Sequence, residues 1–408
     1  MEVALHAPAR LRDLRPEIAK AHELELVPTA MVAGGSALAR DADGQVVFVD
    51  GALPGERVRV AVETEHRGYR TARLVEVIEP SPHRVAPPCP ELARGCGACP
   101  WQHVGVEAQR SLKRDIVLDA LRRIAGLDLA ATRPGAERPT VELPPWSYRT
   151  TVRASVVNGR AGYRRARSHS SIAVDDCLVA HPLLLPLITE ARYPGAKEVV
   201  LRCGTRTGER LAAPTPRRRG IVVPEGVHHH YMHEEVAGRR WRISAASFFQ
   251  SRTDGVDELT RIVGEAADER GATTALDLYS GVGVFAGVLG GRGWTVTAVE
   301  SASSAVKDAR LNLRSLGTTV VSADVTHWSP TPADLVVADP SRNGLAREGV
   351  AVVVASGARR LVLVSCDAAS LGRDTGLLRD AGFELTALTP VDMFPHTFHV
   401  EVVSVFDR

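Results

Sequence analysis

The chain lacks the features of a membrane or secreted protein. No apolar run reaches the length that a helix needs to cross a bilayer, and residues 1–20 carry too many charges for a secretory signal. The 408 residues include only six cysteines, without the scattered spacing of a disulfide framework. We therefore expect a cytoplasmic protein. An excess of one charge sign is also missing: the formal net charge is only +2, so any basic surface must be local.

The length and the 44% hydrophobic content allow two or three domains with cores of their own. Near the N-terminus, alternating apolar runs at 45–50, 57–62 and 71–78 predict short β-strands. Turn-rich segments at 51–55 and 66–69 separate them. Strands of this length and spacing favour an OB-type β-barrel, a fold that binds nucleic acid on one face.

Farther along the chain, four apolar runs each end in a polar residue. The first, from Thr274, leads into a turn containing Gly281 and Gly283 and then into a helix-like segment. The other three end in Glu300, Asp324 and Asp339. Glu300 follows the glycines by roughly 20 residues, the distance at which a carboxylate binds ribose hydroxyls. Any single acid here is an ordinary turn residue, but the ordered set favours an open, mostly parallel sheet with ligands at its carboxyl edge. The glycine loop has no Gly-Lys-Ser/Thr phosphate cradle, so S-adenosylmethionine fits better than ATP.

Two further strand-like runs near the C-terminus bring a nucleophile and a base. The run 360–365 ends at Cys366, and the run 400–406 begins with Val400 and Glu401. Methylation of a pyrimidine at C5 needs a thiolate that adds to C6 and a base that removes the C5 proton. A helix-like segment follows Cys366 and is expected to lower the pKa of its thiol. Cys203, in contrast, is the ordinary buried cysteine of an apolar strand.

The remaining cysteines form a group upstream, Cys89, Cys96, Cys99 and Cys177. One Cys-x-x-Cys pair with two outlying cysteines suits either zinc or an iron-sulfur cluster. Four reduced thiols without a metal are the remaining alternative. The histidine-rich run 228–233 indicates an exposed loop, because consecutive side chains of a strand point to opposite faces and do not converge on one ion.

Four motifs together resemble those of the RNA (uracil-5-)-methyltransferase family: Asp277-Leu-Tyr-Ser-Gly-Val-Gly-Val-Phe285, Asp339-Pro-Ser-Arg-Asn-Gly344, Val364-Ser-Cys-Asp-Ala-Ala-Ser-Leu-Gly-Arg-Asp374 and Asp392-Met-Phe-Pro-His-Thr-Phe-His-Val-Glu401. The resemblance extends from near residue 29 to the C-terminus, and the last two motifs are specific in their order and position. It implies that Cys366 is the nucleophile and that Glu401 is the proton-abstracting base.

The resemblance also implies which residues bind ligands. Gln250, Tyr279, Glu300 and Asp339 match positions that line the cofactor pocket, and Asp339 also lies near the target base. Asp324 is a cofactor candidate from its strand position alone. For Cys89, Cys96, Cys99 and Cys177 the resemblance favours a [4Fe-4S] cluster with a structural role, with zinc as the alternative.

The chain departs from the family pattern at three places. Asp367-Ala368 follows the catalytic cysteine where the family usually has Asn-Pro, and Ser341 replaces the second proline of Asp-Pro-Pro-Arg. Arg252 stands where an asparagine is usual after Phe-Phe-Gln. These differences leave the chemistry in place and bear on the choice of RNA and on the packing of the substrate loop.

The predicted architecture is α/β. After a loosely ordered N-terminus (1–22) we expect an OB-type barrel (23–82), which in the family is a TRAM domain. A small α+β central domain (83–235) then carries the cysteines and the RNA-binding surface, and its helix 109–125 packs on the catalytic domain. Residues 236–408 form a Rossmann-like class I methyltransferase domain.

The predicted function is S-adenosylmethionine-dependent methylation at C5 of a specific uridine in structured RNA, either ribosomal or transfer RNA. We expect a monomer that binds neither DNA nor a membrane. A run of arginines between residues 149 and 167, which contains no acidic residue, is expected to contact the RNA. One alternative is 5-methylcytosine formation, which uses the same thiolate addition. The other is a non-catalytic RNA-binding metal protein that has kept the fold.

Overall fold

The computed structural model describes residues 23–216, 220–268 and 273–408. The expected loose N-terminus (1–22) lies outside the described residues. The chain divides into two compact units, one reaching to Pro82 without residues 33–35, and one formed by those three residues and His83–Arg408. The further division of the second unit into a central and a catalytic domain stays a prediction. No helix in the described ranges is both long and apolar enough to cross a membrane.

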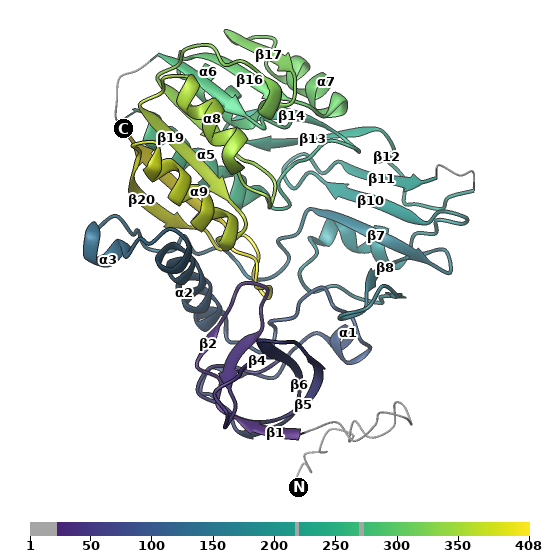
Figure 1. Ribbon diagram of the computed structural model, residues 1–408. Helices are drawn as coiled ribbons and strands as arrows, with labels where there is room; N and C mark the ends of the chain where they lie inside the picture. Colours follow the sequence, from purple (N-terminus) through teal and green to yellow (C-terminus); the bar gives the residue numbers. More distant parts are fainter. Residues whose placement is uncertain (1–22, 217–219, 269–272) are drawn as a thin grey trace, which may run out of the picture. The chain divides into compact units, whose positions relative to one another are not determined.

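The first unit is a curled sheet of six strands in the order β1-β5-β6-β4-β3-β2 (Figure 1). The strands are β1 Glu23–Leu26, β2 Ala30–Met31, β3 Ala37–Arg40, β4 Val46–Asp50, β5 Arg57–Glu65 and β6 Tyr69–Glu79. Val47 and Val49 are buried while their neighbours are not, as the period of two requires. Strands β1 and β2 end the sheet without pairing with each other. The expected OB-type barrel is therefore shown only in part: in the part of the chain that the structure describes, the sheet is curled but not closed.

The second unit begins with a mixed sheet in the order β12-β11-β10-β7-β8-β9. Its strands are β7 Thr151–Val157, β8 Arg160–Arg164, β9 Ser171–Ala173, β10 Glu198–Cys203, β11 Arg210–Thr215 and β12 Val227–His228. Short helices α1 Pro90–Ala93, η2 Pro182–Leu184 and α4 Leu185–Thr189 accompany it, whereas the short helix α3 Leu129–Thr132 lies beside α2 (Val106–Ile124). A hairpin of β13 Tyr231–Val236 and β14 Arg239–Ser244 follows. Its buried Trp241 and Ile243 join the core of the following sheet, so the hairpin packs as part of that layer.

The last part of the chain forms a seven-stranded sheet in the order β17-β16-β15-β18-β19-β21-β20. Its strands are β15 Thr274–Leu278, β16 Thr295–Glu300, β17 Thr318–Ser322, β18 Leu335–Ala338, β19 Arg360–Ser365, β20 Glu384–Pro390 and β21 Val402–Asp407. The first five in space are parallel, and β21 runs antiparallel to both neighbours. The expected open, mostly parallel sheet is thus confirmed. From β17 to β15 the strands stand in reverse sequence order, and from β18 to β19 they stand in sequence order. The switch between β15 and β18 is the place at which such sheets bind ligands.

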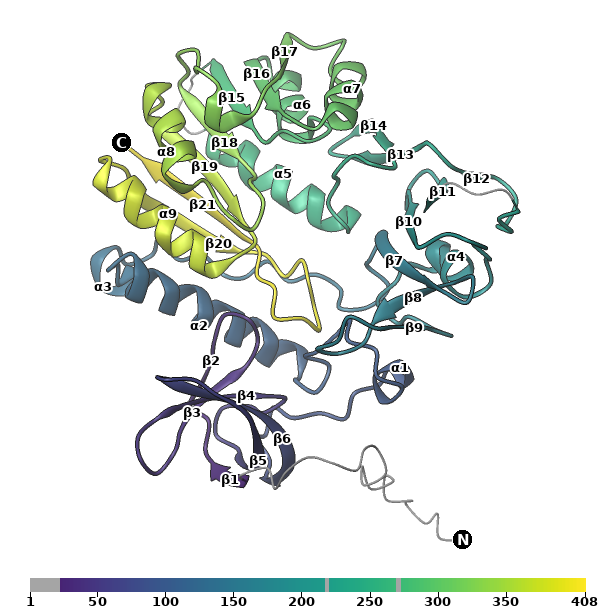
Figure 2. The same cartoon turned by 45° about the vertical axis from the view of Figure 1, so that its right-hand side comes forward.

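Helices cover both faces of this sheet (Figure 2). They are α5 Thr253–Asp268, α6 Val284–Gly291, α7 Ser303–Asn312, η3 Val325–His327, α8 Ala346–Ala355 and α9 Ala368–Asp380. Because both faces are covered, every residue of β18 and β19 is buried. Helix α2 (Val106–Ile124) comes much earlier in the chain and packs along α9. The contact is close: a methyl group on Gly372 of α9 would lie 2.8 Å from the carbonyl oxygen of Ala120.

Candidate active site

A tight turn joins β15 to α6 at the carboxyl end of the sheet. Gly283, with φ of 92°, precedes the helix, and a side chain there would press on Leu313 at 2.7 Å. Gly281 also has a positive φ, and its N–H donates to Oε2 of Glu300 at 2.9 Å. Oε1 of Glu300 accepts from the N–H of Ala302 at 2.7 Å. Glu300 therefore fixes the end of β16 against the glycine turn.

A pocket opens beside this turn. Of the predicted cofactor residues, four line it: Gln250, Tyr279, Gly281 and Asp339. Most of its other lining residues are apolar, and the sequence analysis did not assign them to the pocket: Phe248, Phe249, Val256, Leu259, Val282, Val284 and Phe285. The signal that could have found five of them is their place in the Phe-Phe-Gln and Asp277–Phe285 motifs. Nε2 of Gln250 donates to Oδ2 of Asp339 at 3.1 Å. The pocket thus combines a mostly apolar wall with a few polar groups, the usual composition of a small-molecule site.

Two acidic residues near this turn behave differently. Burial raises the pKa of Asp339 to about 7, while the hydrogen bond from Gln250 opposes the rise. Asp324 is exposed and lies outside the pocket lining. Its carboxylate caps η3 by accepting the N–H of Thr326 at 2.9 Å. Asp324 therefore has a local structural partner, and its predicted role toward a cofactor stays a prediction.

The register of the sheet brings Cys366 and Glu401 together. Ser365, the last residue of β19, is paired with Val402, the first residue of β21. Cys366 follows β19 and Glu401 precedes β21, so the two side chains belong to adjacent positions at the same end of neighbouring strands. Val391 N–H donates to the carbonyl of Glu401 at 2.8 Å and fixes that residue from the other side.

The environment of Cys366 differs from the sequence expectation. Burial raises the pKa of its thiol to about 12, with Glu401 and Asp339 acting in the same direction and Arg342 acting against them. The expected lowering by the helix is wrong for this substrate-free site. Asp367 caps α9 with its own side chain, which accepts the N–H of Ser370 at 2.8 Å. Burial of the thiol, together with the carboxyl groups of Glu401, Asp339 and Asp367, outweighs the effect of the helix N-terminus on this pKa.

Glu401 is almost completely buried, with 2% of its surface exposed. Within the described residues its Oε1 has no hydrogen-bond partner. Burial and the nearby carboxyl group of Asp339 raise the pKa of Glu401 well above its ordinary value. A carboxylate with a raised pKa binds a proton more strongly than an ordinary carboxylate.

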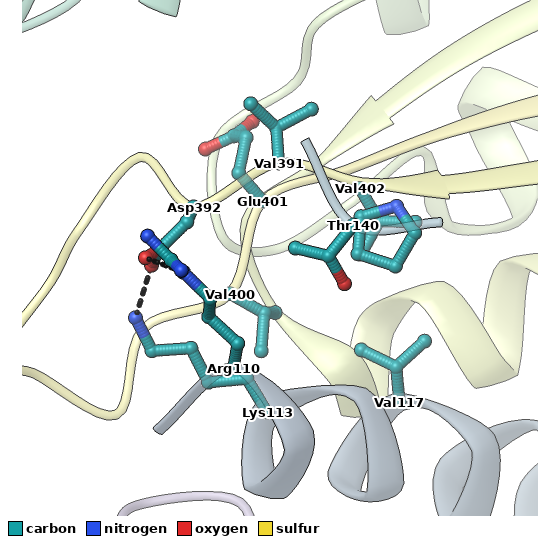
Figure 3. Close-up of a pocket in the computed structure, with 10 residues that line it drawn as sticks. Arg110, Lys113, Val117, Thr140, Val391, Asp392, Val400, Glu401 and Val402 are labelled. Carbon is teal, nitrogen blue, oxygen red and sulfur yellow. Dashed lines mark hydrogen bonds and ion pairs between the residues drawn. The ribbon is translucent and has the colours of Figure 1, made fainter. Parts of the chain in front are cut away.

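The loop from Asp392 to Glu401 is anchored by α2. Lys113 Nζ lies 3.0 Å from Asp392 Oδ1, and Arg110 Nε lies 3.1 Å from Asp392 Oδ2. Figure 3 shows both cations reaching Asp392, while the carboxylate of Glu401 points away from this ion pair. Gln109 accepts the N–H of His396 at 2.6 Å. Sequence reasoning missed these anchors, although Gln109 and Lys113 are four residues apart on one face of the expected helix.

The four upstream cysteines line one small pocket. Cys96, Cys99 and Cys177 are buried, and Cys89 is half-buried. Burial raises the pKa of Cys99 to about 12, and Tyr163 donates a hydrogen bond to Sγ of Cys177 at 3.5 Å. In the described ranges, however, no group of three or more cysteine, histidine or acidic side chains is arranged to hold a metal ion. The fold brings the four thiols together, but their arrangement does not support the expected iron-sulfur cluster.

The arginine run divides into two groups. Arg160 is half-buried and forms an ion pair with Asp175 at 2.7 Å, and Arg149 is also half-buried. The remaining members are exposed: Arg153, Arg164, Arg165 and Arg167. Only this second group has the exposure that phosphate binding requires. Cys203, as expected, is a buried strand residue.

Comparison with known proteins agrees with this geometry. Residues 33–75 match the TRAM domain family. An uncharacterized RNA methyltransferase of Streptomyces avermitilis is 36% identical, over 95% of this chain and 98% of the relative. The 23S rRNA (uracil(1939)-C(5))-methyltransferase RlmD of Methylococcus capsulatus is 32% identical, over 90% of this chain and 93% of the relative.

A solved structure shares the fold along most of the chain. The Pyrococcus abyssi tRNA (uracil-54, C5)-methyltransferase, in complex with S-adenosyl-L-homocysteine, superposes with a TM-score of 0.72 over 94% of this chain and 100% of that chain, at 21% identity. With a catalytic sheet of the expected topology and near full-length relatives above 30% identity, the chain belongs to the RNA (uracil-5-)-methyltransferase family of S-adenosylmethionine-dependent enzymes.

Proposed function

We propose that this enzyme transfers a methyl group to C5 of one specific uridine in a structured RNA, through a covalent bond between Cys366 and C6. The observation that carries the proposal is the strand register. Cys366 and Glu401 lie at adjacent positions of β19 and β21, and both interact electrostatically with Asp339, which lines the pocket. A nucleophile, a base and a ligand pocket thus meet at one edge of the sheet.

Uracil C5 becomes a nucleophile only after addition at C6. The Cys366 thiolate forms a bond to C6, and the electron pair of the C5–C6 double bond moves into an enolate. S-adenosylmethionine, when bound, supplies the methyl group that C5 attacks. Glu401 then removes the C5 proton, the double bond re-forms, and the C6–S bond breaks to return the thiolate. Cys366 and Glu401 therefore act on opposite ends of the same double bond.

The pocket residues fit an adenosyl ligand. Gln250, Tyr279, Gly281 and Asp339 offer polar contacts, and Phe248, Phe249 and Phe285 offer an apolar surface for a purine. Oγ of Ser280 is buried and has no hydrogen-bond partner within the described residues, which leaves it for a ligand. We propose that Glu300 binds the ribose and that Gly283 keeps the turn open. Gly283, Glu300 and Asp324 lie outside the pocket lining, and Asp324 is the weakest member of the proposed set because it is exposed and its carboxylate caps η3.

The RNA is proposed from the relatives. RlmD is named for a uracil of 23S rRNA and the Pyrococcus enzyme for a uracil of tRNA. Because the first of these has the higher identity, ribosomal RNA is the first substrate to test. We propose that the TRAM unit and the exposed arginines Arg153, Arg164, Arg165 and Arg167 hold the flanking RNA, while the target base leaves its stack to reach Cys366.

The experiment is a deletion of the gene in its host, followed by nucleoside analysis of ribosomal and transfer RNA. We expect one 5-methyluridine to disappear and to return when purified enzyme and S-adenosylmethionine are added to the unmodified RNA. Loss of 5-methylcytidine instead would favour the cytosine alternative. RNA affinity without S-adenosylmethionine binding in calorimetry would favour a non-catalytic RNA-binding protein.

We further propose that Cys89, Cys96, Cys99 and Cys177 hold a structural [4Fe-4S] cluster, or a zinc ion. The proposal rests on the fact that all four cysteines line one pocket, because four converging free thiols without a metal would be poorly compensated. The methyl transfer needs no electron, which favours a structural role. Metal and sulfide analysis with the visible absorption spectrum tests the proposal. Protein purified without oxygen that holds neither iron nor zinc would contradict it.

A further inference from the structure

Arg252 is a fully buried arginine at a position where the chain departs from the family pattern. Its side chain is 0% exposed, and its guanidinium lies 4.6 Å from the centre of the Tyr148 ring. Nε and Nη2 donate to the two carboxylate oxygens of Asp254 at 2.7 and 2.6 Å. The asparagine that is usual at this position has one short carboxamide and could not make these contacts together.

The other donors of Arg252 reach two distant segments. Nη1 donates to the carbonyl oxygen of Asp392 at 3.2 Å, and Nη2 donates to the carbonyl oxygen of Pro144 at 3.1 Å. Tyr148, beneath the guanidinium, donates through its hydroxyl to the carbonyl oxygen of Pro395 at 3.1 Å. Arg252 and Tyr148 thus hold the backbone of the loop from Asp392 to Glu401 at two points, Asp392 and Pro395.

The residues around the contact between Arg252 and Asp392 are tightly packed. A methyl group on Gly255, in the first turn of α5, would collide with Met393 and with the side chain of Arg252. The side chain of Asp392 is held independently by Lys113 and Arg110 of α2. At Asp392, the start of the loop that ends in Glu401, α2 therefore holds the side chain and Arg252 holds the backbone.

We propose that Arg252 is a positioning residue for methyl transfer, which ties the start of the loop bearing Glu401 to the segment bearing Gln250. Only one residue, Ser251, separates Arg252 from Gln250, which lines the cofactor pocket. The guanidinium therefore links the cofactor side of the site to its base side. This inference rests on the proposed function and assigns to Arg252 the alignment of Glu401 with the C5 proton.

The test compares Arg252→Met and Arg252→Lys with a matched control, Arg261→Met. Arg261 lies on α5, the helix that begins directly after Arg252, but it is exposed, and its ion pairs in the described ranges are with Glu258 and Glu265. The measurements are the single-turnover rate of 5-methyluridine formation, the KM for S-adenosylmethionine, the fraction of RNA in a covalent adduct, and the melting temperature.

For Arg252→Met we expect the rate to fall by about 100-fold, the effect of misplacing a catalytic group by about 1 Å. The KM for S-adenosylmethionine should change far less, and the adduct fraction should rise because removal of the C5 proton becomes the slow step. Arg252→Lys keeps the charge without the planar fork, so its rate and adduct fraction should fall between those of the wild type and Arg252→Met. Arg261→Met should match the wild type.

Three results would overturn the inference. The first is a wild-type rate in Arg252→Met, or in Arg252→Lys if the methionine variant does not fold. The second is a loss of rate, cofactor affinity and melting temperature in parallel without added adduct, which would make Arg252 a residue of stability alone. The third is an equal loss in Arg261→Met. Wild-type enzyme that forms no 5-methyluridine at all would instead refute the proposed function, and the inference would fall with it.

Discussion

Replacement of Glu401 by glutamine removes the proposed base with almost no change in shape. Glu401 is buried and unpartnered at Oε1 within the described residues, and burial together with Asp339 raises its pKa well above the ordinary value. The amide of glutamine has nearly the same shape as the carboxyl group and carries no charge. We expect the stability at neutral pH to hold, because no new charge is buried and no hydrogen bond to Oε1 is lost.

The chemical effect should be large and confined to one step. A positioned general base contributes roughly 10²–10⁴-fold to a rate, which corresponds to roughly 3–5 kcal/mol of barrier. Addition of Cys366 and methyl transfer precede this step, so Glu401→Gln should still consume one equivalent of S-adenosylmethionine per enzyme. The methylated uridine should then stay bonded to the protein.

The assay is a denaturing gel of enzyme and unmodified RNA, with S-adenosyl-L-homocysteine counted in parallel. We expect a shifted protein-RNA band and a single-turnover burst for Glu401→Gln. The double variant that also carries Cys366→Ala should give no shifted band. Multiple turnovers at the wild-type rate would refute the role of Glu401. So would a burst without an adduct.

The remaining predictions concern the anchor of the loop and the pH dependence of stability. Lys113→Met should lower the free energy of unfolding by about 3 kcal/mol, because it leaves buried Asp392 with one cation fewer, and it should also slow methyl transfer. Urea denaturation measures the change in stability. As a control, replacement of the exposed Lys307 by methionine should leave the free energy of unfolding within about 0.5 kcal/mol of the wild type. Burial raises the pKa of Asp277 from 3.8 to about 8, so the stability that this group contributes is complete below pH 3.8 and is lost as the pH rises toward 8. Between pH 5 and 8 the wild type should therefore lose about 1.4 kcal/mol per pH unit relative to Asp277→Asn, and parallel curves for the two proteins in urea denaturation would contradict this.

The sequence was informative where its patterns are local. Alternating runs predicted β4, β5 and β6, and the apolar runs that end in acids predicted an open, mostly parallel sheet. The glycine turn lies beside a pocket because Gly281 and Gly283 supply positive φ at the end of a central strand. Cys366 and Glu401 could be paired in advance because each lies at one end of a strand within a specific motif.

Tertiary features escaped prediction. Lys113 and Asp392 are 279 residues apart, so no local pattern indicates their ion pair. The buried guanidinium of Arg252 donates a hydrogen bond to the carbonyl oxygen of Asp392, which is 140 residues away in the chain. The raised pKa of Cys366 arises first from burial of the thiol and then from the carboxyl groups of Glu401 and Asp339, and together these outweigh the nearby helix on which the sequence expectation relied. The side chain at one position is visible in the sequence, but the charges that surround it are set by the fold.

The central claim is the bond between Sγ of Cys366 and C6 of the target base. RNA that carries 5-fluorouridine tests it most directly, because Glu401 cannot remove fluorine from C5 and the adduct cannot resolve. After incubation with S-adenosylmethionine and digestion with protease and nuclease, mass spectrometry should find the peptide containing Cys366 joined to a methylated fluorouridine. Product formation without any covalent adduct, or attachment at Cys203 or another cysteine, would contradict the account.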